Sequence, residues 1–222
     1  RAFHAAAQMF RRVAAQDDAP IVLLLEDLHW ADEGSLDFLA RLTRVNRDVP
    51  MLILGLTRPT LFERPASWPG NTDGRRIELG PLNESASRLL ANELLKKLPE
   101  VPAALQALIS EGAEGNPFYM EELVNMLVDQ GAIEAEPERW TLHPHKLLAA
   151  HVPQTLTGVL QARLDGLPAT ERFTLQEASV IGFVFWDQAL VAIDPQAGLS
   201  LPTLVRRALA LPRQGVNLEG MR

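Results

Sequence analysis

The sequence contains no cysteine, which excludes disulfides, thiolate metal sites and a cysteine nucleophile. No apolar run approaches the roughly 20 residues that a helix needs to cross a membrane. The glycine-rich pattern GxxxxGK[ST] occurs nowhere in the 222 residues, so one common cradle for nucleotide phosphates is missing. No segment has the basic excess of a nucleic-acid-binding face. The net charge is −7, and residues 81–150 carry 11 acidic side chains against 5 basic ones.

The chain also lacks an initiating methionine and begins within a basic, amphipathic pattern, RAFHAAAQMFRRVAAQ. A transit peptide can look similar, but we interpret the chain as a fragment of a longer protein, with the cytoplasm as its compartment. Hydrophobic residues make up 47% of the sequence and charged residues 22%, a balance typical of globular proteins. The length suits one large or two small domains.

The stretch Ile21–Asp32, IVLLLEDLHWAD, is the most informative part of the sequence. Its five leading aliphatic residues predict a strand that is buried on both faces of a parallel sheet. Glu26 and Asp27 follow at the carboxyl end of that strand, where ligands bind in open α/β sheets. Two adjacent carboxylates there can hold Mg²⁺ on a nucleotide phosphate and orient a water molecule. In many α/β proteins, however, acids at a strand end only cap the next helix.

Over residues 1–80 the hydrophobic pattern predicts helices and strands in alternation, which is typical of a parallel sheet with helices on its faces. Asp32 or Ser35 is expected to cap the helix between the two aliphatic strands. The expected elements are a helix at 3–15, strands at 21–25 and 51–56 with a helix between them, and a short strand at 76–79.

Residues 81–222 are expected to be mainly helical, with one short strand at Trp140–Leu142. Three helices within 151–222 suit a winged-helix domain. The expected helix starts are Asn83, Pro102, Pro117, Pro153, Pro168 and Pro202.

The segment IVLLLEDLHWAD resembles the Walker B region of the STAND-type signalling ATPases. These belong to the AAA-like P-loop class and occur beside nucleotide-cyclase domains and in LuxR/MalT-like regulators. Three further segments resemble other blocks of this family and follow in the same order. They are GNPFYMEELVNMLVDQG, VPQTLTGVLQARLDGLP and LVRRALALPRQGVNLEGMR. The resemblance implies an α/β fold: the C-terminal half of a P-loop parallel sheet over 1–80, a helical lid over 81–150 and an incomplete winged-helix domain over 151–222.

The resemblance also implies roles for three residues near the strand ends. Glu26 stands where the family coordinates Mg²⁺ through water, and Asp27 where it places the acid that activates the attacking water. The usual order is Asp then Glu, so the pair is inverted here and the longer Glu shifts the metal distance. Arg58, in the segment LGLTRP, resembles the sensor 1 residue that reaches a γ-phosphate. The alternative is a structural salt bridge from Arg58 to Glu26 or Asp27.

Gly115, Asn116 and Pro117 resemble the family's GxP motif, whose proline packs near the adenine of bound ATP. A plain turn at a helix start has the same residue types, and both interpretations stay open. Leu28 and Trp30 are expected to pack beside the end of the sheet rather than to bind a ligand.

Two functions from different classes remain open. The first is an ATP-dependent switch that binds ATP and Mg²⁺, with Asp27 and Arg58 as catalytic residues. The second, which the inverted acids favour, is a non-catalytic protein- or DNA-interaction module with a degenerate ATPase site. Expected partners are ATP, other domains of the longer protein and a second copy of the chain. We expect no membrane contact, and no nucleic-acid contact because 151–222 is near neutral. Without the phosphate loop, the 222 residues alone are expected to bind ATP poorly and to lack ATPase activity.

Overall fold

A computed structural model describes residues 2–17, 20–64 and 74–213 of the chain. The contacts divide the chain into two compact units, residues 1–78 and 79–222, which are described separately below.

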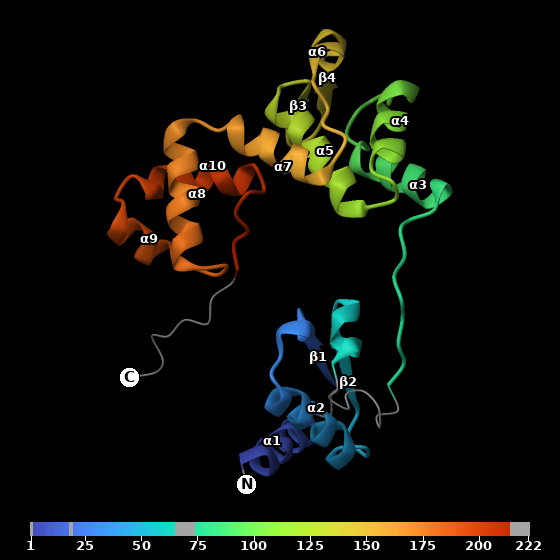
Figure 1. The fold of residues 1–222 in the computed structure, drawn as a ribbon, viewed down its shortest axis with the longest axis vertical. Coiled ribbons are helices and arrows are strands. Elements are labelled where there is room, and N and C mark those ends of the chain that lie inside the picture. The colour runs from blue at the N-terminus through green and yellow to red at the C-terminus, as the bar shows by residue number, and fades with distance from the viewer. Residues whose placement is uncertain (1, 18–19, 65–73, 214–222) are drawn as a thin grey trace. The chain divides into compact units, whose positions relative to one another are not determined.

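The first unit holds a parallel pair of strands with helices before and between them (Figure 1). The strands pair in register from Ile21↔Met51 to Leu25↔Gly55. The helix predicted at 3–15 and both aliphatic strands are confirmed. The elements are α1 (Ala2–Asp17), β1 (Ile21–Leu25), the 3₁₀ turn η1 (Leu28–Trp30), α2 (Glu33–Val45), β2 (Met51–Gly55) and the 3₁₀ turn η2 (Pro59–Glu63).

The prediction that the first strand is buried on both faces is wrong. Val22 and Leu24 are each 58% exposed, and their partners Leu52 and Leu54 are 51% and 46% exposed. On the other side, Leu25 packs against a small cluster that includes Leu28, Leu36, Leu39 and Leu61. Because successive side chains of a strand point to opposite faces, the described part of this sheet has one covered face and one open apolar face.

The segment that leads out of the first unit is not the strand predicted at 76–79. Residues 74–82 form no regular element, and Ile77 and Leu79 are 74% and 89% exposed. Arg76 stacks its guanidinium over the Phe62 ring at 4.0 Å and pairs with Glu78 at 2.7 Å. Among the described residues, no strand pairs with this segment, so it has no hydrogen-bonded ladder to make it a β-strand.

The regular elements described in the second unit are helices apart from one short hairpin. The strand predicted at Trp140–Leu142 is confirmed as β4, and it pairs antiparallel with β3, from Ile133↔Leu142 to Ala135↔Trp140. The other elements are α3 (Glu84–Leu94), α4 (Ala103–Gly112), α5 (Pro117–Asp129), β3 (Ile133–Ala135), α6 (Pro144–Ala149), α7 (Leu156–Asp165), α8 (Ala169–Ile181), α9 (Asp187–Ile193) and α10 (Ala197–Arg206).

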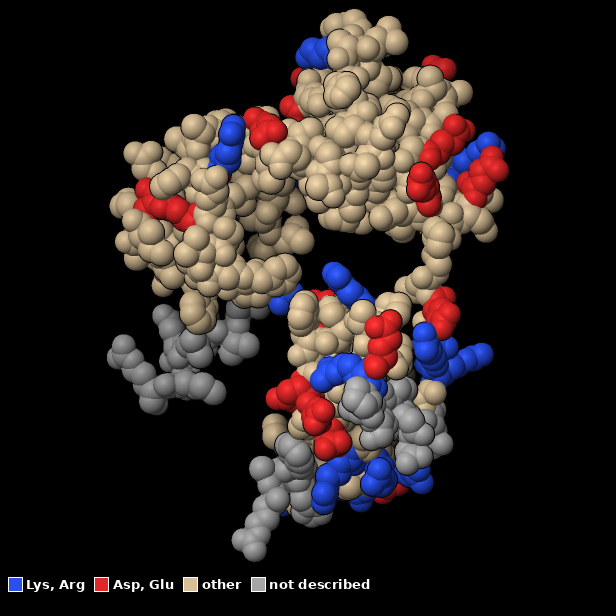
Figure 2. All heavy atoms as spheres, in the orientation of Figure 1, with Lys and Arg blue, Asp and Glu red and all other residues tan. Residues whose placement is uncertain are grey.

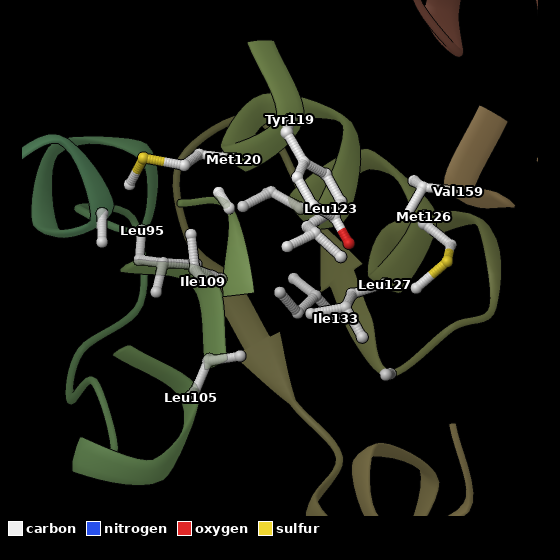
Figure 3. Packing of buried hydrophobic residues seen from close by; sticks show 14 of the residues in the cluster. Leu95, Leu105, Ile109, Tyr119, Met120, Leu123, Met126, Leu127, Ile133 and Val159 are labelled. Carbon is white, nitrogen blue, oxygen red and sulfur yellow. The ribbon is translucent and has the colours of Figure 1, made fainter. Parts of the chain in front are cut away.

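Helix α5 is the centre of the second unit's main core (Figure 3). It contacts α3, α4, β3 and α7, so it is apolar nearly all round, as a helix surrounded by others must be. Its most buried side chains are Met120, Leu123, Met126 and Leu127. Around them lie residues from the neighbouring elements: Ala91, Leu95, Leu105, Ile109, Ile133 and Val159.

The predicted fold class, the second half of a P-loop parallel sheet with a lid and a winged helix, is wrong. The described residues are mostly helical, and their sheets are the parallel pair β1–β2 and the hairpin β3–β4. Between residues 143 and 213 there is no strand that could form a wing. Pro202 lies inside α10 rather than at its start. Residues 214–222, the end of the third resembling block, lie outside the described residues.

Candidate functional site

The ends of β1 and β2 bring the polar residues after each strand close together. Beyond the paired Leu25 and Gly55, Leu56 N–H donates to Leu25 O at 2.8 Å. One step further, Leu28 N–H donates to Leu56 O at 3.0 Å. The strands are parallel, so their carboxyl ends lie at the same edge of the sheet. Glu26 and Asp27 therefore share this edge with the Thr57–Arg58 segment.

Asp27 has an unusual backbone at this edge. Its φ of 53° and ψ of 37° place it in the left-handed region, which few residues other than glycine occupy and which often marks functional positions. The carboxylate caps no helix, since it accepts no hydrogen bond from η1, and its side chain is 68% exposed. The alternative that this acid only caps the next helix does not hold for Asp27.

Asp32, not Asp27, caps the next helix. Its Oδ1 accepts a hydrogen bond from Ser35 N–H at 2.6 Å at the start of α2. Of the two predicted capping residues, Asp32 and Ser35, the cap is therefore Asp32. The hydrogen bonds from Ser35 hold the pKa of Asp32 below its ordinary value. Arg64 donates to Ala31 O at 2.7 Å just before this cap. The turn between the strand-end acids and α2 is thus fixed by its own contacts.

Arg58 is exposed at the end of β2. In the described part of the chain, its guanidinium makes no ion pair with Asp27. The alternative role for Arg58 was a structural salt bridge to Glu26 or Asp27. The bridge to Asp27 is therefore absent. An exposed arginine that is not paired with this carboxylate can still bind an anion.

The residues after Asp27 differ in burial from the expectation. Leu28 is buried, as predicted, but Trp30 is 81% exposed and its predicted packing beside the sheet is wrong. The sequence assigned His29 no chemistry and predicted only that it packs and orients the loop after the strand; its side chain is 7% exposed. Both of its ring nitrogens lack a hydrogen-bond partner among the described residues. The sequence signal for this burial was the position of His29 between two bulky apolar residues, Leu28 and Trp30.

Gly115, Asn116 and Pro117 form the start of α5. Asn116 accepts from the N–H groups of Phe118 and Tyr119 at 3.1 and 3.3 Å, and Pro117 is the first helical residue. Gly115 has φ 77°, and a Cβ there would lie 2.4 Å from Leu82 O, so only glycine fits. These residues make the helix-start turn that was one of the two interpretations. They belong to the second unit, whereas Glu26, Asp27 and Arg58 belong to the first.

The strand-end acids fit a hydrated cation better than a cation enclosed by protein. No group of three or more His, Asp or Glu side chains is placed to hold a metal ion within the described ranges. Mg²⁺ commonly keeps several waters and uses only one or two carboxylates together with substrate phosphates. Glu26 is exposed and the Asp27 carboxylate is mostly so, which suits that shared mode of binding.

Comparison with known proteins finds that one segment of the second unit is similar to a domain family. Residues 83–140 match "Domain of unknown function (DUF8739)", which covers α3 to the start of β4. The chain is also 28% identical over 185 residues to "Uncharacterized protein R02095" of Rhizobium meliloti (strain 1021). That alignment covers 82% of this chain but 17% of the relative, so the chain spans about a sixth of that protein's length. In the described residues, no helix has both the length and the apolarity to cross a membrane.

Proposed function

We propose that this chain is part of an ATP-dependent signalling switch of the STAND type, and that the edge formed by the ends of β1 and β2 is its phosphate and Mg²⁺ site. The observation that carries the proposal is the placement of Glu26, Asp27 and Arg58 on adjacent parallel strand ends. Two carboxylates and an arginine not bonded to Asp27 are the groups that a metal-bound phosphate needs.

Each of the three residues has a distinct task in this proposal. Glu26 holds hydrated Mg²⁺ through a water, and Asp27 orients and deprotonates the water that attacks the terminal phosphate. Arg58 neutralises negative charge that develops on the phosphate. Bound Mg²⁺ supplies the charge that polarises the phosphate oxygens.

The proposed setting is a longer, cytoplasmic protein. The relative in Rhizobium meliloti is far longer than the aligned region, which supports a module whose partners are other domains, such as a cyclase, DNA-binding or helical-repeat domain, or a second copy. Figure 2 shows few Lys or Arg side chains on the visible face of the second unit. Such a face does not favour nucleic acid, and we propose no direct contact with nucleic acid or membrane.

A non-catalytic interaction module is the second candidate. The open apolar face of β1–β2, formed by Val22, Leu24, Leu52 and Leu54, favours it, because exposed apolar patches mark interaction sites. The inverted order of the acids also favours it. In this case the strand-end site would be degenerate and would not bind nucleotide in a metal-dependent way.

The two candidates differ in how the strand-end edge responds to a nucleotide. We expect Mn²⁺-ATP, with the paramagnetic Mn²⁺ in place of Mg²⁺, to broaden the backbone amide NMR signals of Glu26, Asp27 and Arg58. The method detects weak binding, which is needed because the sequence has no GxxxxGK[ST] loop. Glu26→Gln should remove most of this broadening.

The matched control is Asp37→Asn, which removes one exposed acid from α2 in the same unit. It should leave the broadening unchanged. Mn²⁺ alone at the same concentration should broaden these signals less than Mn²⁺-ATP does, because the nucleotide contributes to binding. Broadening that is equal in Glu26→Gln and in the unmodified chain, or that is spread over all exposed acids, would reject the nucleotide site and favour the interaction module.

A further inference from the structure

His29 is buried without the partners that a buried imidazole normally has. Its side chain is 7% exposed, and neither Nδ1 nor Nε2 makes a hydrogen bond within the described residues. A neutral imidazole has one donor and one acceptor nitrogen, and buried polar groups are nearly always paired. An unpaired side chain of this kind beside a candidate site points to a contact that forms only when the site is in use.

The carboxylate of Asp27 lies beside the ring. The distance from His29 Nδ1 to Asp27 Oδ1 is 3.9 Å, which is about 1 Å too long for a hydrogen bond. Asp27 is the residue with the left-handed backbone, and that conformation at the start of η1 sets where its carboxylate lies relative to the ring. A small side-chain rotation is enough to close the gap.

The other side of the ring is limited by Trp30. The centroids of the two rings are 5.1 Å apart and their planes are tilted by 41°. Trp30 is 81% exposed, so this ring contact lies at the surface. This arrangement holds His29 beside Asp27 and leaves the carboxylate open to solvent.

We propose that His29 is a positioning residue for Asp27. Its imidazole carries the proton on Nδ1. This N–H donates a hydrogen bond to the Asp27 carboxylate when that carboxylate binds water or a hydrated cation. The protonated nitrogen of a histidine is set by the hydrogen bond that it makes, and such partners fix the orientation of a functional carboxylate. This inference deepens the proposed function and rests on it for the role of Asp27, but the tautomer can be tested without nucleotide.

The first test is a long-range ¹H–¹⁵N NMR spectrum of the imidazole rings in the unmodified chain, at a pH where the His29 ring is neutral. We expect His29 to carry its proton on Nδ1. Asp27→Asn should shift the Nδ1 signal, whereas Asp37→Asn should leave it unchanged. A ring protonated on Nε2, or an Nδ1 signal that does not respond to Asp27→Asn, would overturn the proposal.

The second test uses two variants that imitate one ring nitrogen each. The amide nitrogen of Asn lies near the position of Nδ1, and that of Gln lies near Nε2. His29→Asn should keep the Mn²⁺-ATP broadening at Asp27 that the unmodified chain shows. His29→Gln should weaken the apparent affinity for Mn²⁺-ATP about 10-fold or more, as is typical when a group that orients a ligand is lost. Equal loss in both variants with equal loss of melting temperature would mean that His29 only fills space, and would contradict the proposal.

The outcomes separate the two proposals. If the unmodified chain shows no localised Mn²⁺-ATP broadening, the proposed function fails, and the tautomer and its response to Asp27→Asn still decide whether His29 positions Asp27. If broadening is localised and depends on Glu26 but His29 is protonated on Nε2, the proposed function stands and the positioning role is rejected.

Discussion

Tyr119 is the single tyrosine of the chain, and its contacts tie the start of α5 to the segment before α7. The side chain is buried, and its hydroxyl donates to Pro153 O at 2.7 Å. Burial raises the pKa of Tyr119 above its ordinary value of 10.0, and the nearby Glu114 raises it further. The neutral phenol is thus the form that suits the folded chain, because only it can donate this hydrogen bond.

The ultraviolet absorbance of tyrosinate therefore reports one known residue. We expect its titration midpoint to lie above pH 10.0 in the folded chain and to return to the ordinary value in denaturant. Since the folded pKa is raised, the stability it contributes is complete below pH 10.0 and is lost as the pH rises through the folded pKa. Tyr119→Phe should abolish the signal and cost about 1 kcal/mol of unfolding free energy. A midpoint at the denatured value would contradict the buried, hydrogen-bonded phenol.

Single residues at the candidate site were predictable in type but not in environment. The acids Glu26 and Asp27 after an aliphatic run indicated a strand-end site, and the structure places them at such an end. The left-handed backbone of Asp27 and the exposure of Trp30 were not predictable. These depend on how the chain turns between β1 and α2, which one-dimensional spacing does not specify.

At the level of elements, helices with long apolar stripes were predicted well and short or irregular ones were not. The strand β3 has three residues of which only Ile133 is buried, so it carries no alternating pattern. In α10 the buried face runs through the small residues Ala197 and Ser200 to Leu204. That face continues past Pro202, and packing along it outweighs the usual tendency of proline to begin a helix.

The open face of β1–β2 shows a second limit of sequence-based prediction. A run such as IVLLL indicates burial on both faces of a strand, but it does not specify which elements pack on each face. The aliphatic side chains of Val22 and Leu24 satisfy the pattern and are nevertheless more than half exposed. The prediction of burial on both faces failed for this reason, since the pattern describes what a strand needs rather than what surrounds it.

The capping contact of α2 is testable through its pH dependence. Because the hydrogen bonds from Ser35 lower the pKa of Asp32 below 3.8, the stability from the ionised cap is complete above pH 3.8 and is lost as the pH falls through the folded pKa. Asn is also a good capping residue but does not ionise. The difference in unfolding free energy between the unmodified chain and Asp32→Asn should thus be larger at neutral pH than in strong acid.

Asp37→Asn provides the control for this measurement, since it removes the same charge from an exposed position on the same helix. Denaturant unfolding of the unmodified chain and both variants, at neutral pH and well below pH 3.8, gives the comparison. A difference for Asp32→Asn that does not change with pH, or that matches the difference for Asp37→Asn, would show that the cap contributes no pH-dependent stability.

At the scale of a whole unit, one buried arginine connects helices that are distant in sequence. Arg163 of α7 is 2% exposed and bonds to Glu122 of α5, to Asp129 at 2.9 Å and to the backbone carbonyl of Arg207. Arg207 in turn lies 3.4 Å from Asp129. The network thus links the α5 core to the end of α10. No local pattern reveals it, because its members are 34 to 44 residues apart in sequence.

Removing Arg163 should therefore damage the second unit far more than removing a surface arginine. Arg163→Met keeps most of the stem but leaves Glu122 without its counter-charge and Asp129 with Arg207 alone, and breaking a buried ion pair in this way costs about 3–5 kcal/mol. Arg88→Met is the matched control: Arg88 pairs with Glu84 at 2.6 Å on α3, but its side chain is 56% exposed, and such pairs contribute about 1 kcal/mol or less. Both costs can be read from denaturant unfolding followed by circular dichroism.

A further variant separates lost charge compensation from lost packing. Adding Glu122→Gln to Arg163→Met removes the uncompensated charge of Glu122 while keeping the shape of its side chain. If the cost arises from uncompensated buried charge, the double variant should be more stable than Arg163→Met alone, even though it carries an additional substitution. If the double variant is instead less stable, or if Arg163→Met costs no more than Arg88→Met, then the ion network does not hold α7 and α10 to the α5 core.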